Sequence, residues 1–309
     1  KKIVALSMAA CMAASVTACG GSKPAETTAA ASEAATEAAE STEAAESSAE
    51  ETKAAAEIET VTSGKLTVAT SPDFAPYEFY AIGEDGTPKL AGFDMDLAQY
   101  IADYLGLALV VVTVDFDGVI SELQTKSVDL GMAGLSPDEK RMGIMDFSDL
   151  YYMGGQSLVT VKDNAEKYNS FEAINKPDVS VGAQVGSIQM DLANENSPEA
   201  DIVGLPKVTD IISELLTGKM DAAYIETDVA KSYQKNYPEL TLVMDVPYDA
   251  EGSAIGVCKG NEALLAGVNE AIAAAKEDGS LEKFIADAGE LAAGEKYEGL
   301  LDAEGNVQN

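Results

Sequence analysis

Few side chains in this sequence could perform nucleophilic or metal chemistry. The 309 residues include no histidine, which removes the commonest general base and every Ser–His or Cys–His nucleophile arrangement. Of the three cysteines, Cys11 and Cys19 lie near the start, and only Cys258 follows later, in an apolar stretch that predicts a buried core position. The sequence also contains no Ca²⁺-binding loop of the D-x-[DN]-x-[DN]-G type. We therefore expect no catalytic residue, no metal site and no cofactor.

The residues around Cys19 indicate that its thiol is a site of modification and not of catalysis or metal binding. Two lysines are followed by an apolar run at residues 3–14, which is too short to span a bilayer. Small residues then lead to Cys19 and Gly20, a pattern typical of bacterial lipoprotein signals. We expect residues 1–19 to be such a signal, with lipid on Cys19 holding the protein on the extracytoplasmic face of the cell membrane. An ordinary signal peptide with an incidental cysteine is the alternative.

The next segment, residues 20–62, consists almost wholly of Ala, Glu, Ser and Thr and contains no aromatic residue. It has nothing to bury, so we predict a disordered tether. The remaining roughly 245 residues suit one large domain or two small ones. The formal net charge of −33 argues against nucleic acid as a partner, because phosphate binding needs clustered Lys and Arg.

After the tether, β-rich runs alternate with helical patterns. Phe93 to Leu107 carry apolar residues at four-residue spacing, which predicts an amphipathic helix. Strands are expected at residues 65–70, 109–114 and 129–134, with a helix near Val119 between the last two. This order favours parallel sheets with helices on both faces.

One part of the chain nearly repeats another. Residues 120–130, ISELQTKSVDL, have a counterpart in residues 212–222, ISELLTGKMDA. Chance similarity of one helix–turn–strand unit is the alternative, but a similar order of elements recurs around the second copy. It comprises strands at 179–182, 202–205 and 222–226 and helices at 187–195 and 208–216. We predict two similar α/β lobes that share one ligand cleft, since ligands bind outside the carboxyl ends of such strands.

Six short motifs carry a resemblance to a known family. They are TSPDFAPYEF at 70–79, GFDMDLA at 92–98, AGLSPDEKR at 133–141, DFSDLYY at 146–152, GSIQ at 186–189 and DAAYIE at 221–226. Over about residues 64–289 the chain resembles the bacterial extracellular solute-binding proteins, family 3, which feed polar amino acids to ABC importers. The resemblance implies the periplasmic-binding-protein-like fold of type II.

The resemblance also implies a set of ligand-binding residues. They are Phe74, Phe116, Gly134, Ser136, Arg141, Ser187, Gln189 and Glu226. Arg141 matches the arginine that grips the ligand carboxylate, for which a guanidinium offers two parallel donors. Glu226 stands where the family usually has an Asp that pairs with the ligand ammonium. Phe74 and Phe116 match the aromatic positions that sandwich the ligand side chain.

Several of these positions also have a purely structural interpretation. Ser136, followed by Pro137 and Glu139, is typical of a helix N-cap with a capping box, and Ser187 also precedes a predicted helix. Asp94 and Asp96 are interpreted as acids at a helix start. Asp138 replaces the usual Ser or Thr of the family, and could compete with the ligand carboxylate for Arg141 or simply cap the helix.

The ligand side chain is less constrained by the sequence. Ser71 stands where relatives that bind basic amino acids carry an Asp. Asp73 nearby could supply the missing charge, so cationic ligands stay open.

Together these observations predict a membrane-anchored substrate-binding component of an ABC importer. Lobe 1 is expected at residues 63–154 plus 249–291, lobe 2 at 155–248, and a C-terminal tail at 292–309. Two crossing strands, near residues 155–157 and 246–247, would form the hinge. The expected partners are a free amino acid, the permease and ATPase subunits, and the membrane through Cys19, with the protein itself a monomer. A ligand-sensing lipoprotein and a dehydratase-type enzyme on the same fold are the alternatives.

Overall fold

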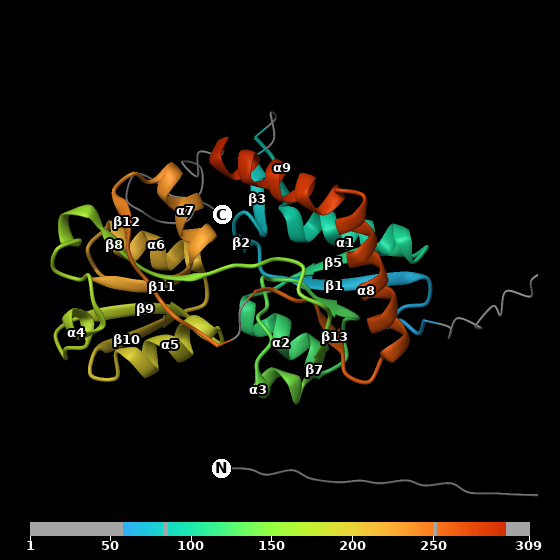
Figure 1. The fold of residues 1–309 in the computed structure, drawn as a ribbon, viewed down its shortest axis with the longest axis horizontal. Coiled ribbons are helices and arrows are strands. Elements are labelled where there is room, and N and C mark those ends of the chain that lie inside the picture. The colour runs from blue at the N-terminus through green and yellow to red at the C-terminus, as the bar shows by residue number, and fades with distance from the viewer. Residues whose placement is uncertain (1–57, 83–85, 250–251, 295–309) are drawn as a thin grey trace, which may run out of the picture. The chain divides into compact units, whose positions relative to one another are not determined.

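Two five-stranded sheets organise the computed structural model (Figure 1), which describes residues 58–82, 86–249 and 252–294. The predicted lipoprotein signal with Cys19, nearly all of the tether and the end of the tail lie outside these residues. The described residues belong to one compact unit. Each sheet belongs to one α/β lobe, so the predicted two-lobed fold class is confirmed.

Lobe 1 contains the first sheet, in the strand order β5-β1-β6-β13-β7, and a small antiparallel sheet, β2-β3-β4. The strands of the first sheet are β1 (Lys65–Thr70), β5 (Ala108–Thr113), β6 (Leu130–Gly131), β7 (Met145–Phe147) and β13 (Gly256–Cys258). The small sheet consists of β2 (Asp73–Phe74), β3 (Glu78–Ile82) and β4 (Pro88–Ala91). The helices of this lobe are α1 (Phe93–Tyr104), α2 (Phe116–Gln124), α3 (Glu139–Met142), α8 (Glu262–Glu277) and α9 (Ser280–Gly294).

Lobe 2 contains the second sheet, in the order β10-β9-β11-β8-β12. Its strands are β8 (Gln156–Val161), β9 (Ser180–Gln184), β10 (Asp201–Leu205), β11 (Ala222–Glu226) and β12 (Leu240–Asp245). Its helices are the short 3-10 helix η1 (Lys162–Asn164), α4 (Phe171–Ile174), α5 (Ile188–Asn196), α6 (Val208–Leu216) and α7 (Thr227–Asn236). The bounds of β1, α6 and β11 agree with the ranges expected from the sequence.

Helices flank both sheets, as expected, but the sheets are not purely parallel. In lobe 1, β1 runs parallel to β5 and β6, whereas β13 pairs antiparallel with β6 and β7. In lobe 2, β9 runs parallel to β10 and β11, whereas β8 pairs antiparallel with β11 and β12. The sequence-based expectation was wrong on this point, because the antiparallel strands are those that follow or precede the passages between the lobes.

The internal repeat produces the same local structure twice. After α2 the chain turns at Lys126 with φ of 57°, and after α6 it turns at Gly218 with φ of 71°. The aspartate that follows then secures the start of a neighbouring strand. Asp129 accepts a hydrogen bond from the Thr67 N–H at 2.7 Å, and Asp221 accepts one from the Ser180 N–H at 3.0 Å.

Apolar faces explain how the helices attach. Phe93, Leu97 and Ile101 on α1 are fully buried, which confirms the amphipathic pattern. Helices α1, α8 and α9 lie side by side, while α2 covers the opposite face of the first sheet (Figure 1). Cys258 is a buried free thiol, as predicted. Within the described ranges, we find no helix with the length and apolar character needed to cross a membrane.

Two passages connect the lobes and lie beside each other. The Val246 N–H donates to the Gln156 carbonyl at 2.8 Å, where β8 begins and β12 has just ended. Nearby, Tyr152 and Ser253 form an isolated antiparallel bridge. These are the segments in which the hinge was predicted.

Candidate functional site

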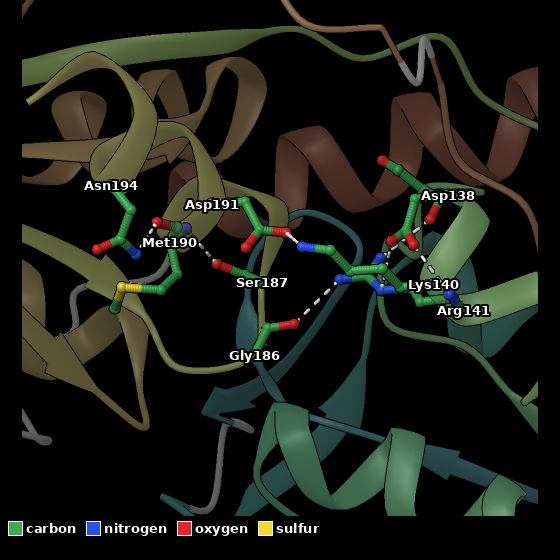
Figure 2. A network of polar contacts seen from close by, with 9 residues as sticks. Asp138, Lys140, Arg141, Gly186, Ser187, Met190, Asp191 and Asn194 are labelled. Carbon is green, nitrogen blue, oxygen red and sulfur yellow. Dashed lines mark hydrogen bonds and ion pairs between the residues drawn. The ribbon is translucent and has the colours of Figure 1, made fainter. Parts of the chain in front are cut away.

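Arg141 lies on α3 at the boundary between the lobes, and its side chain is almost fully buried. Its Nη1 donates to the Ser136 carbonyl at 3.0 Å, and its Nη2 donates to the Gly186 carbonyl of lobe 2 at 3.1 Å (Figure 2). The Asp138 carboxylate lies 3.1 Å from Nε. A guanidinium has five N–H donors, so these contacts leave one on each terminal nitrogen. Two donors are the number that a bidentate bond to a carboxylate requires.

The N-cap of α3 is Asp138, not Ser136. The Asp138 carboxylate accepts a hydrogen bond from the Arg141 N–H at 2.8 Å, and α3 begins at Glu139. The expected Ser136 cap was wrong and the alternative cap at Asp138 is confirmed, because Asp138 can satisfy the backbone N–H and the side chain of Arg141 together. Asp138 therefore caps the helix and also occupies one edge of the guanidinium.

Phe116 and Gly186 complete the surroundings of Arg141. The guanidinium carbon lies 5.5 Å from the centre of the Phe116 ring, within the range of a cation–π contact. A Cβ on Gly186 would approach the Asp117 side chain to 3.2 Å, so lobe 2 comes close to the start of α2 here. An exposed ion pair between Lys140 and Asp191, at 2.8 Å, also joins the two lobes (Figure 2).

The remaining predicted residues of lobe 2, apart from Glu226, cluster at the start of α5. Ser187 is the N-cap, as the structural interpretation expected, because its hydroxyl oxygen accepts a hydrogen bond from the Met190 N–H at 3.2 Å. The same hydroxyl donates to the Gln184 carbonyl at 2.7 Å. Gln189 donates to the side chain of Gln156 at 2.9 Å. All of these side chains except Met190 are buried.

Phe74 and Gly134 lie against each other in lobe 1. Gly134 has φ of 56°, and a Cβ there would come within 2.9 Å of the Phe74 ring, so a side chain at this position would collide with it. The Gly134 N–H donates to Asp94 at 3.2 Å. Asp94 lies in the first turn of α1, as expected, but it is fully buried and also accepts from the Tyr151 hydroxyl at 2.6 Å. Asp94 thus links α1 to the loop that carries Gly134.

Glu226 ends β11 and caps α7. One carboxylate oxygen accepts from the Val229 N–H at 2.7 Å and the other from the Gly155 N–H at 3.3 Å. Burial raises the pKa of Glu226 from 4.5 to about 7, although these backbone donors act in the opposite direction. A Cβ on Gly154 would lie 2.8 Å from Glu226 and 3.0 Å from the Tyr77 hydroxyl. Glycine at 154 therefore keeps the space between these two polar groups open.

Six of the predicted residues form a connected series, whereas Phe74 and Gly134 contact each other elsewhere in lobe 1. Glu226 pairs with Gln156 in the sheet, Gln156 contacts Gln189, and the same turn that holds Ser187 carries the carbonyl that Arg141 contacts. Gln156 and Gly154 were not predicted as site residues from the sequence. Neither belongs to a quoted motif, and each reaches the series through the passage between the lobes.

A cavity of about 770 Å³ takes its walls from both lobes, and none of the predicted ligand-binding residues lines it. Four aspartates and one lysine contribute to its lining, namely Asp73, Asp115, Asp117, Asp210 and Lys207. Aromatic residues complete it, including Phe79, Tyr80 and Tyr233. The cavity is therefore acidic with aromatic walls, and Asp117 connects it to the contact between Arg141 and Gly186.

Comparison with known proteins identifies the family. Residues 66–287 match the bacterial extracellular solute-binding proteins, family 3, and the chain belongs to this family. The arginine-binding extracellular protein ArtP of Bacillus subtilis is 34% identical over 224 residues, covering 71% of this chain and 84% of ArtP. The amino acid ABC transporter substrate-binding protein AbpA of Streptococcus pneumoniae, solved with L-arginine, has a TM-score of 0.72 and 33% identity, covering 75% of this chain and 97% of AbpA.

An enzyme is also among the relatives. Cyclohexadienyl dehydratase of Pseudomonas aeruginosa is 30% identical over 181 residues, covering 59% of this chain and 66% of the enzyme. The family and the two-lobed fold nevertheless confirm the predicted class, which is the extracytoplasmic substrate-binding component of an amino-acid ABC importer.

Proposed function

We propose that this protein captures an amino acid with a cationic side chain, of which arginine is the first candidate. The observation that carries the proposal is the acidic cavity, which Asp117 links to the turn of Gly186 that contacts Arg141. Asp115, Asp117 and Asp210 against one lysine favour a positive side chain, whereas the Asp73 carboxylate is already bonded to Val208 and Gln184. The relative from Bacillus subtilis is named an arginine-binding protein, and the one from Streptococcus pneumoniae was solved with L-arginine bound. Both support arginine as the ligand.

In this proposal the two ends of the ligand backbone are held by opposite charges. The N–H pair on the terminal nitrogens of Arg141 binds the carboxylate, and Glu226 receives the ammonium. Phe74 and Phe116 flank the side chain, while Gly134, Ser136, Ser187 and Gln189 shape and line the cleft. The ligand contacts both lobes only when they close about the hinge, so its differential affinity shifts the equilibrium toward the closed state. The closed form then docks on the permease.

A thermal-shift screen against the common amino acids tests this function. A ligand present at about 100 times its dissociation constant should add about 2.7 kcal/mol of stability. We expect arginine and lysine to raise the melting temperature more than glutamine, and glutamate to have the smallest effect. Stabilisation by glutamate above arginine would contradict a cationic ligand, while no stabilisation by any amino acid would contradict the capture of free amino acids.

A dehydratase-type enzyme is the second candidate, and one observation favours it. A carboxyl group with a pKa near 7 inside a cleft could protonate a leaving hydroxyl group. We prefer a binding role without catalysis because both Glu226 oxygens already accept backbone hydrogen bonds from Gly155 and Val229. Incubation with prephenate, followed by absorbance of the aromatic product, tests this choice. Turnover abolished by Glu226→Gln would establish the enzyme.

We also propose that lipid on Cys19 anchors the mature protein, as a monomer, to the extracytoplasmic face of the cell membrane. The small residues before Cys19 and the Ala- and Glu-rich tether after it support this proposal. Cys19→Ala should release the protein from membranes without changing ligand affinity, because neither the signal nor the tether belongs to the cleft. Fractionation with a carbonate wash measures the release, and Cys11→Ala is the control that should stay bound. A Cys19→Ala protein that remains in the membrane fraction would refute lipid anchoring.

A further inference from the structure

The start of α6 is secured in an unusual way. The N-cap position is Lys207, whose side chain cannot accept a hydrogen bond and makes no capping contact. Ser187 and Glu226, by contrast, cap α5 and α7 from within lobe 2. The first turn of α6 receives its acceptor from lobe 1 instead, because the Val208 N–H donates to the Asp73 carboxylate. A helix that lacks its own cap is thus capped by the opposite lobe.

Asp73 makes further contacts of the same kind. Its carboxylate accepts a hydrogen bond from Gln184 of lobe 2 at 3.2 Å, and its carbonyl accepts one from the Tyr233 hydroxyl on α7 at 3.0 Å. Within lobe 1, the Ser71 hydroxyl donates to the same carboxylate at 2.8 Å and fixes its orientation. The Asp73 side chain is buried, and three segments of lobe 2 therefore converge on one residue of lobe 1.

We infer that Asp73 is a positioning residue that latches the two lobes by capping α6 from the opposite lobe. The contacts to Val208, Gln184 and Tyr233 join elements on both sides of the cleft, so separation of the lobes must break them. When the lobes separate, the Val208 N–H in the first turn of α6 loses the Asp73 carboxylate as its acceptor and binds water instead. Closure is therefore favoured by an interaction that involves no ligand atom.

This role predicts a uniform effect on affinity. The apparent affinity of a ligand scales with the population of the binding-competent state, whichever ligand is used. Loss of an N-cap acceptor shifts such an equilibrium by about 2- to 30-fold. Asp73→Ala should therefore lower the affinities for arginine and for glutamine by the same factor, within that range. A residue that reads the ligand side chain would instead lower the affinity for arginine selectively.

The test combines calorimetric titration with a distance measurement in the full-length protein. Spin labels at Tyr104→Cys on lobe 1 and Glu199→Cys on lobe 2, both exposed positions, report the separation of the lobes without ligand. Asp73→Ala should lengthen this distance and lower the affinities for both amino acids by the same factor. Asn261→Ala, which removes the cap of α8 inside lobe 1, is the matched control and should change neither the distance nor the affinities.

Three results of the titrations would overturn the latch. They are a loss confined to arginine, unchanged affinity for both amino acids, and an Asn261→Ala effect equal to that of Asp73→Ala. The affinity measurement depends on the proposed capture of amino acids, whereas the distance measurement does not. If the wild-type protein bound no amino acid, the proposed function would fail, and an unchanged distance in Asp73→Ala would separately refute the latch.

Discussion

Arg141→Ala should abolish measurable amino-acid binding while leaving a folded protein that melts cooperatively. Truncating one partner of a buried, hydrogen-bonded charge pair costs about 2–5 kcal/mol, because the other charge is left unpaired. At about 1.4 kcal/mol per tenfold, affinity should fall by roughly 30- to several-thousand-fold. Calorimetric titration with the amino acid found in the thermal screen measures the change.

Two further variants separate carboxylate binding from the other contacts of Arg141. Arg141→Lys should also lose most of the affinity, since one ammonium cannot replace two parallel N–H donors. Lys140→Ala removes a neighbouring cation that joins the lobes only through an exposed ion pair with Asp191. Exposed pairs contribute about 0–1 kcal/mol, so this control should lose less than about fivefold. A loss below threefold in Arg141→Ala would refute the whole assignment of the site.

Local patterns predicted the elements that position the site, and long-range contacts explain what the sequence could not predict. The bounds of α6 and β11 followed from apolar spacing and from the repeat, because both signals lie within a few residues. The antiparallel direction of β13 depends on a chain that returns from lobe 2, which no local pattern encodes. Asp73 contacts Val208 across 135 residues of sequence, so its capping role was equally hidden.

The start of α3 shows a third kind of limit. Ser136 and Asp138 are both good N-cap residues, and Pro137 between them suits a helix that starts at either. Asp138 is the cap because it bonds the backbone and the guanidinium of Arg141 at once. The sequence therefore left both caps open, because the choice between them depends on the orientation of the Arg141 side chain, which residue spacing does not encode.

Glu226→Gln should weaken zwitterion binding by roughly 30-fold or more, for the same reason that applies to Arg141. Folding should be preserved, because an amide oxygen can still accept from the Val229 N–H. Calorimetry at about pH 8, where the wild-type carboxylate is ionised, measures the loss. Unchanged affinity would remove Glu226 from the ammonium site and direct attention to Asp138.

The pH dependence supplies an independent test of the same carboxylate. Burial raises the pKa of Glu226 in the free protein to about 7, whereas a bound ammonium favours the ionised form. Ligand affinity should therefore reach its maximum above pH 7, and it should fall by up to about tenfold per pH unit as the pH drops below 7. Asp73 and Asp94 have pKa values raised to about 6, so the decisive window lies between about pH 6.5 and 8.5. In that window Glu226→Gln should show a flat profile, and a slope equal to that of the wild type would assign the titration to another group.

Ionisation of Glu226 has opposite effects on ligand binding and on folding. It strengthens binding and lowers the stability of the ligand-free protein. A carboxyl group whose folded pKa lies above its ordinary value stabilises the fold at low pH, and this contribution is lost as the pH rises through about 7. Without ligand, the wild-type protein should therefore lose stability as the pH rises from about 4.5 to about 7 and change little above it, while Glu226→Gln should lack this part of the loss. Thermal unfolding of both proteins between about pH 4.5 and 8 measures this difference. At low pH the protein should bind ligand more weakly, and its ligand-free fold should be more stable. If both changes disappear in Glu226→Gln, one buried carboxylate that binds the ligand ammonium causes both.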